Sequence, residues 1–103
     1  MADPRFFDNT GPLDLSRICQ LTGAKVLSGP TDTAIWDVAS LDRAAQQHVT
    51  FCDSPKFTGP LKLTRASAVF VTSALATHVP AGVQALECAR PSMAFAQVAT
   101  ALY

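Results

Sequence analysis

Apolar residues recur every three or four positions near both ends of the chain, which is the spacing of an amphipathic helix. Residues 14–24 carry this pattern between Asp14, a suitable N-cap, and Gly23, a suitable stop. Residues 91–103 repeat it behind Pro91, which suits a first helical position. The apolar positions of this second segment are Met93, Phe95, Ala96, Val98, Ala99 and Leu102. We expect one helix near each end of the chain.

Short runs between these two helices favour strands. ASAVFVT, residues 66–72, is apolar enough to be covered on both faces, as parallel strands usually are. Residues 49–52 and 83–88 are further strand candidates. IWDVASL, residues 35–41, alternates imperfectly, and we interpret its Trp36 as a core or sheet-packing residue. Strands alternating with helices predict one small α/β domain with a mixed or mostly parallel sheet and flanking helices.

The octapeptide TFCDSPKF, residues 50–57, sets Phe51 and Phe57 on either side of a small polar turn. Two interpretations stay open from the residues alone. Both rings can be core residues that clamp a strand-to-helix corner, with Ser54 as a cap. Alternatively, the two rings can form a shallow aromatic platform for a planar ligand.

The helix that follows this turn has a clear start but cannot run smoothly. Ser54 suits its N-cap, and Pro55 suits the first helical position, where its missing N–H is not needed. Gly59 and Pro60 then interrupt the next turn, and a proline inside a helix costs about 3 kcal/mol. We therefore expect a broken or restarted helix over residues 55–64.

Composition limits the class of protein. The chain has 103 residues, 49% of them hydrophobic and 16% charged, which fits one globular domain with a single core. Eight basic residues balance eight acidic ones, so we expect no nucleic-acid partner. The apolar runs, such as residues 68–71, fall far short of the roughly 20 residues that span a bilayer. The opening MADPRFFDNTGP lacks a secretory h-region, so we expect neither a membrane span nor secretion.

Three cysteines, Cys19, Cys52 and Cys88, are widely spaced and form no CxxC pair. This spacing suggests neither a disulfide framework nor a zinc knuckle, and a reducing cytoplasm fits it best. Thiols without an adjacent base commonly behave as small apolar residues, so we expect all three in or near the core.

Catalytic and cofactor motifs are missing from the sequence. It contains no G-x-G-x-x-G fingerprint, P-loop or G-x-S-x-G elbow, and we expect no cofactor or metal. His48 and His78 stand beside no second residue of identifiable role. We therefore assign no catalytic residue to this chain.

The order of these features along the whole chain resembles a known family, the UDP-3-O-acylglucosamine N-acyltransferases of lipid A biosynthesis in Gram-negative bacteria, at their N-terminal domain. The segments that carry the resemblance are ADPRFFDNTGPLDLSRICQLTGA, VASLDRA, TFCDSPKF, TRASAVFVT and ARPSMAFAQVATALY. The resemblance implies that residues 1–103 form a uridine-binding α/β domain similar to the UDP-binding N-terminal domains of the muramyl ligases. In the family a left-handed β-helix follows, forms a trimer and carries the catalytic histidine.

The resemblance also assigns roles within TFCDSPKF. The family pattern sets phenylalanine, asparagine and tyrosine at the places of Phe51, Ser54 and Phe57, with a lysine at Lys56. Aromatic faces can stack on uracil, at about 1 to 3 kcal/mol per stack. Ser54 offers a shorter hydroxyl in place of an amide, and Phe57 lacks the tyrosine hydroxyl, so polar recognition is weakened while stacking is kept. Lys56 and the first helical N–H groups are candidate contacts of a diphosphate.

The function implied is to hold the UDP end of UDP-3-O-acylglucosamine while a 3-hydroxyacyl group is transferred from acyl carrier protein. The pattern of the last helix stops at Tyr103 without a cap, which we interpret as a helix cut short. We expect the isolated domain to be an inactive monomer and the full-length enzyme a homotrimer. The alternative is a structural or interaction module that has lost nucleotide recognition, as the changes at Ser54 and Phe57 suggest.

Overall fold

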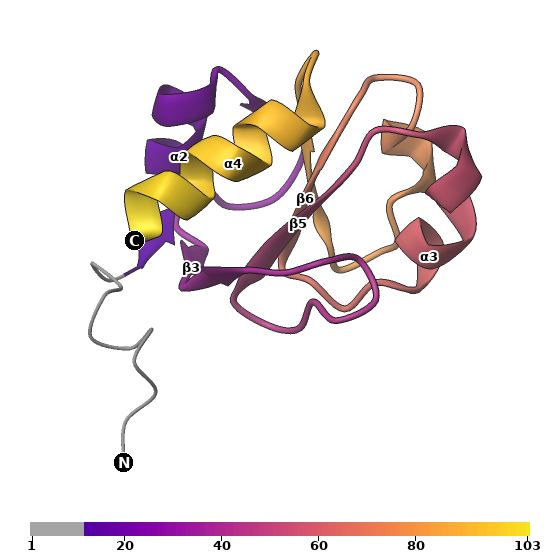
Figure 1. Ribbon diagram of the computed structural model, residues 1–103, viewed down its shortest axis with the longest axis horizontal. Coiled ribbons are helices and arrows are strands. Elements are labelled where there is room, and N and C mark those ends of the chain that lie inside the picture. The colour runs from indigo at the N-terminus through magenta and orange to yellow at the C-terminus, as the bar shows by residue number, and fades with distance from the viewer. Residues whose placement is uncertain (1–11) are drawn as a thin grey trace.

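Short strands and helices alternate along the chain in the computed structural model, which describes residues 12–103 (Figure 1). The opening segment, on which the resemblance and the missing h-region partly rest, lies outside the described residues. The elements are, in order, β1 (Leu13–Asp14), α2 (Leu15–Thr22), β2 (Lys25–Val26), β3 (Ala34–Ile35), β4 (Asp37–Val38), β5 (His48–Cys52), η1 (Pro55–Phe57), α3 (Thr58–Leu63), β6 (Ala68–Val71), η2 (Ala76–His78), β7 (Gln84–Glu87) and α4 (Pro91–Leu102).

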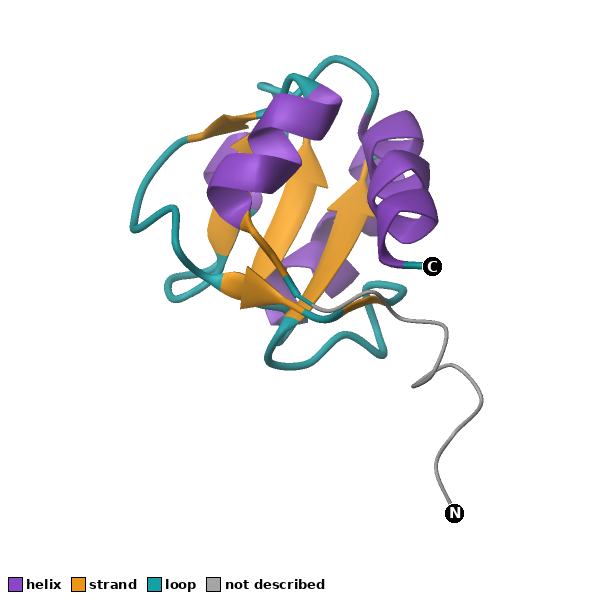
Figure 2. Cartoon of the chain, turned by 90° about the vertical axis from the view of Figure 1, so that its left-hand side faces the viewer, coloured by secondary structure: helices purple, strands orange, loops and turns teal. Residues whose placement is uncertain are grey.

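The main sheet has five strands in the order β2-β7-β6-β5-β4. Strands β4 to β7 run parallel to one another, and β2 joins β7 antiparallel at one edge. Helices lie on both sides of these strands (Figure 2). β1 and β3 form a separate antiparallel pair. The predicted small α/β domain with a mixed, mostly parallel sheet is confirmed.

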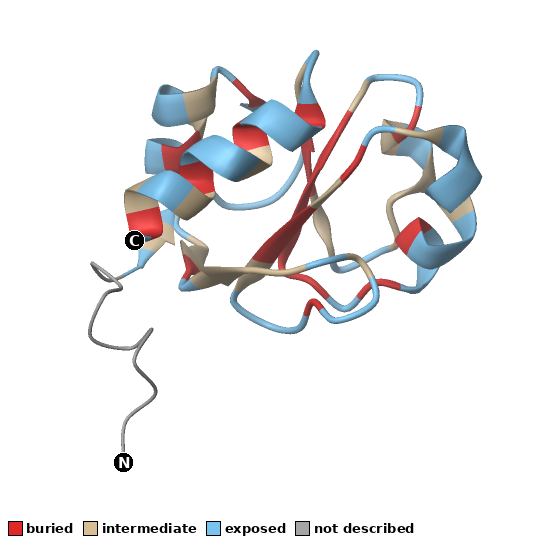
Figure 3. Cartoon of the chain, viewed as in Figure 1, coloured by how far each residue is buried: buried red, intermediate tan, exposed pale blue. Residues whose placement is uncertain are grey.

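Each face of the sheet is covered by its own layer. Helices α2 and α4 pack against each other and α4 lies over β4, β5 and β6, whereas α3 and η2 cover the other face (Figure 1). Side chains alternate between these layers along β6: Phe70 enters the core under α2 and α4, and Val69 and Val71 enter a smaller core under α3. All four residues of β6 are buried (Figure 3), so the prediction of a strand covered on both faces is confirmed.

The helix ends follow the sequence signals. Asp14 Oδ1 accepts the Arg17 N–H at 2.8 Å, and Gly23 ends α2 with a φ of 76°, a left-handed conformation that favours glycine. Helix α4 begins at Pro91, as predicted. Its predicted apolar face is partly wrong, because Met93 is 49% exposed. The buried positions are Pro91, Ala94, Val98 and Leu102.

The predicted strand at residues 35–41 is two separate strands. β3 pairs with β1 in the small sheet and β4 pairs with β5 in the main sheet, so the chain changes sheets at Trp36. The Trp36 N–H donates to the Gln47 carbonyl at 2.8 Å, and its side chain is 43% exposed. Trp36 is therefore not a core residue, so that half of the interpretation is wrong, and the sheet-packing alternative stays a prediction.

All three cysteines are free, and their positions confirm the prediction of core or near-core thiols. Cys52 is buried in the smaller core, while Cys19 and Cys88 are half-buried against the larger one. Within the described part of the chain, no helix has both the length and the apolar character needed to cross a membrane.

Candidate functional site

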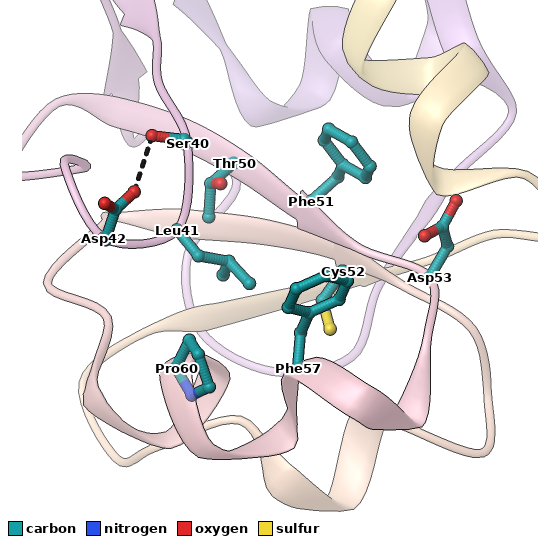
Figure 4. A pocket seen from close by; sticks show the side chains of 9 residues that line it. All are labelled: Ser40, Leu41, Asp42, Thr50, Phe51, Cys52, Asp53, Phe57 and Pro60. Carbon is teal, nitrogen blue, oxygen red and sulfur yellow. Dashed lines mark hydrogen bonds between the residues drawn. The ribbon is translucent and has the colours of Figure 1, made fainter.

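A pocket of about 440 Å³ opens where β4 and β5 end. The loop after β4 forms one wall, the last residues of β5 form the floor, and η1 and α3 form the other wall (Figure 4). In open α/β sheets, ligands bind in the crevice outside the carboxyl ends of the parallel strands, which is where this pocket lies. Its lining residues are Ser40, Leu41, Asp42, Thr50, Phe51, Cys52, Asp53, Phe57 and Pro60.

Phe51 and Phe57 both line this pocket, but their surroundings differ. The Phe51 ring is half-buried and lies 4.8 Å from the Phe95 ring of α4, centroid to centroid, at an angle of 51°. The Phe57 ring is 52% exposed and lies on the other side of the β5 ribbon (Figure 4). The two rings therefore line the same pocket but differ in exposure. Phe51 also packs against the core, whereas Phe57 presents an exposed face.

Ser54 and Lys56 lie in the turn beside the pocket and do not line it. The Ser54 hydroxyl oxygen accepts the Lys56 N–H at 3.3 Å, which confirms the predicted N-cap. This bond occupies one of the N–H groups that were candidates for a diphosphate. The helix restarts at Thr58, so the predicted interruption over residues 55–64 is confirmed.

Thr50 is a pocket residue that the sequence pattern did not single out. Its side chain is 0% exposed, and its Oγ1 has no hydrogen-bond partner among residues 12–103. A buried polar group without a partner costs about 1 to 3 kcal/mol. The signal in the sequence is a threonine inside an otherwise apolar strand, next to Phe51.

The loop after β4 supplies a charged group to the pocket. Ser40 Oγ donates to Asp42 Oδ1 at 2.8 Å (Figure 4). This hydrogen bond holds the pKa of the exposed Asp42 carboxyl below its usual range, and Arg43 adds a smaller contribution. Asp42 is therefore an ionised acceptor at neutral pH. The turn VASLDRA was part of the family resemblance, but no role had been assigned to its residues.

Cys52, His48 and His78 supply neither an activated nucleophile nor a base to the pocket. Burial raises the pKa of the Cys52 thiol, so it stays protonated at neutral pH. His48 lies at the amino end of β5, away from the pocket, where its Nδ1 accepts the Ala45 N–H at 3.1 Å. His78 lies in η2 and does not line the pocket. Within residues 12–103, no group of three potential metal ligands is found.

The fold and the pocket define a class of protein: a small α/β domain with an aromatic-lined, largely apolar pocket at the carboxyl edge of its parallel strands. The profile of the family UDP-3-O-(3-hydroxymyristoyl) glucosamine N-acyltransferase, LpxD, matches residues 32–101. The chain belongs to this acyltransferase family, and the resemblance noted from the sequence is confirmed.

Curated relatives align along nearly all of this chain. It is 36% identical over 103 residues to the UDP-3-O-acylglucosamine N-acyltransferase of Granulibacter bethesdensis, covering 100% of this chain and 30% of the relative. The enzymes of the same name from Nitrobacter hamburgensis and Bradyrhizobium diazoefficiens are 38% and 41% identical over 100 and 101 residues, with 96% of this chain and 28% of each relative covered. The chain thus spans about 30% of the length of these relatives and corresponds to their N-terminal part.

Proposed function

We propose that this chain is the uridine-nucleotide-binding domain of a cytoplasmic N-acyltransferase of lipid A biosynthesis. It holds the UDP end of UDP-3-O-acylglucosamine while a region beyond these residues transfers a 3-hydroxyacyl group from acyl carrier protein. The observation that carries the proposal is that Phe51 and Phe57 line one pocket at the carboxyl end of β5, in a chain that belongs to this family.

The roles within the pocket follow from exposure. Phe57 presents the face on which uracil stacks, and Phe51 borders the ring from the side of the core. Ser54, beside the pocket, supplies a hydroxyl that still has its proton to donate, because the oxygen only accepts from the Lys56 N–H. The exposed Lys56 is a candidate phosphate contact. Binding of the nucleotide then positions the reacting amine and performs no chemistry itself.

A second candidate is an interaction module without nucleotide recognition. This candidate is supported by two groups that would recognise uracil but already have partners within the domain. The Ser54 oxygen caps η1, and the Phe51 ring packs on Phe95. The two candidates differ in whether the pocket discriminates a pyrimidine from a purine nucleotide.

Titration of the isolated chain with UDP and with ADP, followed by NMR, separates the two candidates. We expect UDP to shift resonances of residues 50–57 with a dissociation constant in the millimolar range, about 4 kcal/mol, and ADP to bind more weakly. Absence of shifts at several millimolar UDP, or an equal response to ADP, supports the interaction module.

Phe57→Ala is the informative variant, because its ring is exposed and its loss leaves the core intact. It should abolish detectable UDP binding while the domain stays folded. Met93→Ala, which removes a similarly exposed apolar side chain from α4, is the matched control and should bind UDP normally. Ser54→Asn should tighten binding, because an amide provides both a donor and an acceptor for the imide edge of uracil.

We also propose that the isolated chain is an inactive monomer and that the trimeric assembly depends on the remainder of the full-length enzyme. Neither His48 nor His78 lines the pocket, and the Cys52 thiol there is protonated at neutral pH. An N-acylation assay of the purified chain should therefore show no turnover, and sedimentation should give the monomer mass. Turnover that is lost on substituting either histidine would contradict this assignment.

A further inference from the structure

A second depression, of about 810 Å³, continues the aromatic pocket along the surface. The two share Leu41, Asp42 and Pro60, so they form one groove. In Figure 4, Asp42 lies toward one side of the pocket and Phe51 toward the other. Beyond Asp42 the groove is lined by two arginines, Arg43 and Arg65. Its character therefore changes from aromatic to carboxylate to cationic along its length.

Each part of this groove suits a different chemical group. The aromatic pocket offers stacking surface for a base. Asp42 is an ionised carboxylate and can only accept hydrogen bonds, so it suits hydroxyl donors such as those of a ribose. Guanidinium groups present forked donors that match phosphate oxygens. A nucleotide carries these groups in the same order, because its base and its phosphates are attached to opposite ends of the ribose.

We propose that the groove fixes the direction of the bound nucleotide, with the base stacked on Phe57 and bordered by Phe51, the ribose hydroxyls at Asp42, and the diphosphate at Arg43 and Arg65. This assignment rests on the proposed function and extends it. The reverse direction would bring the phosphates toward Asp53, which lines the far side of the aromatic pocket, and like charges repel. Lys56 is the competing phosphate contact, but it lines neither depression.

The diphosphate assignment is tested by measuring dissociation constants of uridine, UMP and UDP by NMR titration. For the unaltered chain, affinity should rise with each added phosphate and should fall with salt. The double variant Arg43→Gln/Arg65→Gln should lose about tenfold in affinity for UDP, since an exposed charge pair contributes up to about fivefold, and should bind uridine as before. Arg17→Gln, which removes an exposed cation from α2, is the matched control and should change neither value.

The ribose assignment is tested with uridine and 2′-deoxyuridine. The unaltered chain should prefer uridine by a few-fold, and Asp42→Asn should remove most of that preference because its amide is a weaker acceptor than a carboxylate. Circular dichroism of every variant should match that of the unaltered chain, since Asp42, Arg43 and Arg65 are exposed.

Four results would overturn the assignment. Equal binding of uridine and UDP, or a phosphate dependence that Lys56→Gln removes and the double arginine variant keeps, refutes the direction but leaves uridine recognition standing. A double variant that weakens uridine and UDP equally refutes the phosphate contact in the same way. Failure of the unaltered chain to bind either ligand refutes the proposed function as well.

Discussion

The two faces of the sheet differ in how completely they are packed. Under α2 and α4, a continuous core surrounds Phe70, and its large side chains are fully buried. Under α3, a smaller core leaves Phe57 exposed, and Thr50 at the edge of the pocket has no hydrogen-bond partner among the described residues. The comparison indicates that one face stabilises the domain, while the end of the other face provides the surface available to a ligand.

Strand β5 shows this division within consecutive residues. Val49 and Phe51 point toward α4, and Thr50 and Cys52 point toward α3. Phe51 therefore links the packed face to the pocket, because its ring contacts Phe95 and also lines the site. Under the proposed function, a substitution at Phe51 should change both stability and nucleotide binding, whereas a substitution at Phe57 should change binding alone.

The largest expected effect on stability comes from comparing the removal of one phenylalanine ring from each face of the sheet. Phe70→Ala should lower the free energy of unfolding by about 3 to 5 kcal/mol, because it leaves a cavity in the packed core. Phe57→Ala should change it by less than about 0.5 kcal/mol, because the ring is exposed. Urea denaturation measures both values. Similar losses for the two variants would show that the α3 face carries as much stability as the α2 and α4 face.

A change of opposite sign is expected from two threonines. Thr50→Val should raise the free energy of unfolding by about 1 kcal/mol, since it removes a buried hydroxyl that has no partner within the described residues. Thr22→Val should lower it by a similar amount, because the Thr22 hydroxyl donates to the Ile18 carbonyl at 2.8 Å and accepts the Ala24 N–H at 3.2 Å. Denaturation midpoints test the pair, and destabilisation by Thr50→Val would mean that its hydroxyl is satisfied in solution.

The helix caps sharpen the comparison at a smaller scale. Asp14→Ala should destabilise the domain by about 1 kcal/mol, because Asp14 caps an eight-residue helix that packs on the larger core. Ser54→Ala should have an effect of a few tenths of a kcal/mol, because its hydrogen bond of 3.3 Å caps a three-residue turn with no buried side chain. Thermal unfolding of both variants is the measurement. An equal loss would assign η1 a structural role comparable to that of α2.

The sequence predicted the elements better than it predicted the site, for a physical reason. Caps, glycine stops and apolar runs are local signals, so α2, the interrupted helix and β6 could be assigned from their own residues. The pocket depends on pairing between β4 and β5, which brings the loop at Ser40 to Asp42 beside residues far along the chain. No local signal shows that contact, nor that Trp36 turns outward where the chain changes sheets.

The smallest effect concerns the cysteines, which lie on both faces. Burial raises the pKa of the Cys19, Cys52 and Cys88 thiols. As the pH rises above the ordinary thiol pKa of about 8.5, the unfolded chain loses these protons first, so the native state then binds more protons and the free energy of unfolding falls. This contribution is constant below that pH and is lost as the pH rises through the folded-state values.

Urea denaturation between pH 7 and pH 10 should therefore show a decline that Cys52→Ala and Cys19→Ala each reduce, while Arg17→Gln, the exposed control, leaves the cysteine contribution unchanged. Because Cys52 lines the pocket, a ligand seated there should also slow its alkylation and leave that of Cys19 unaffected. An identical pH profile in the unaltered chain and both alanine variants would show that the thiols ionise equally in the folded and unfolded states. In that case, burial on neither face protects them from water.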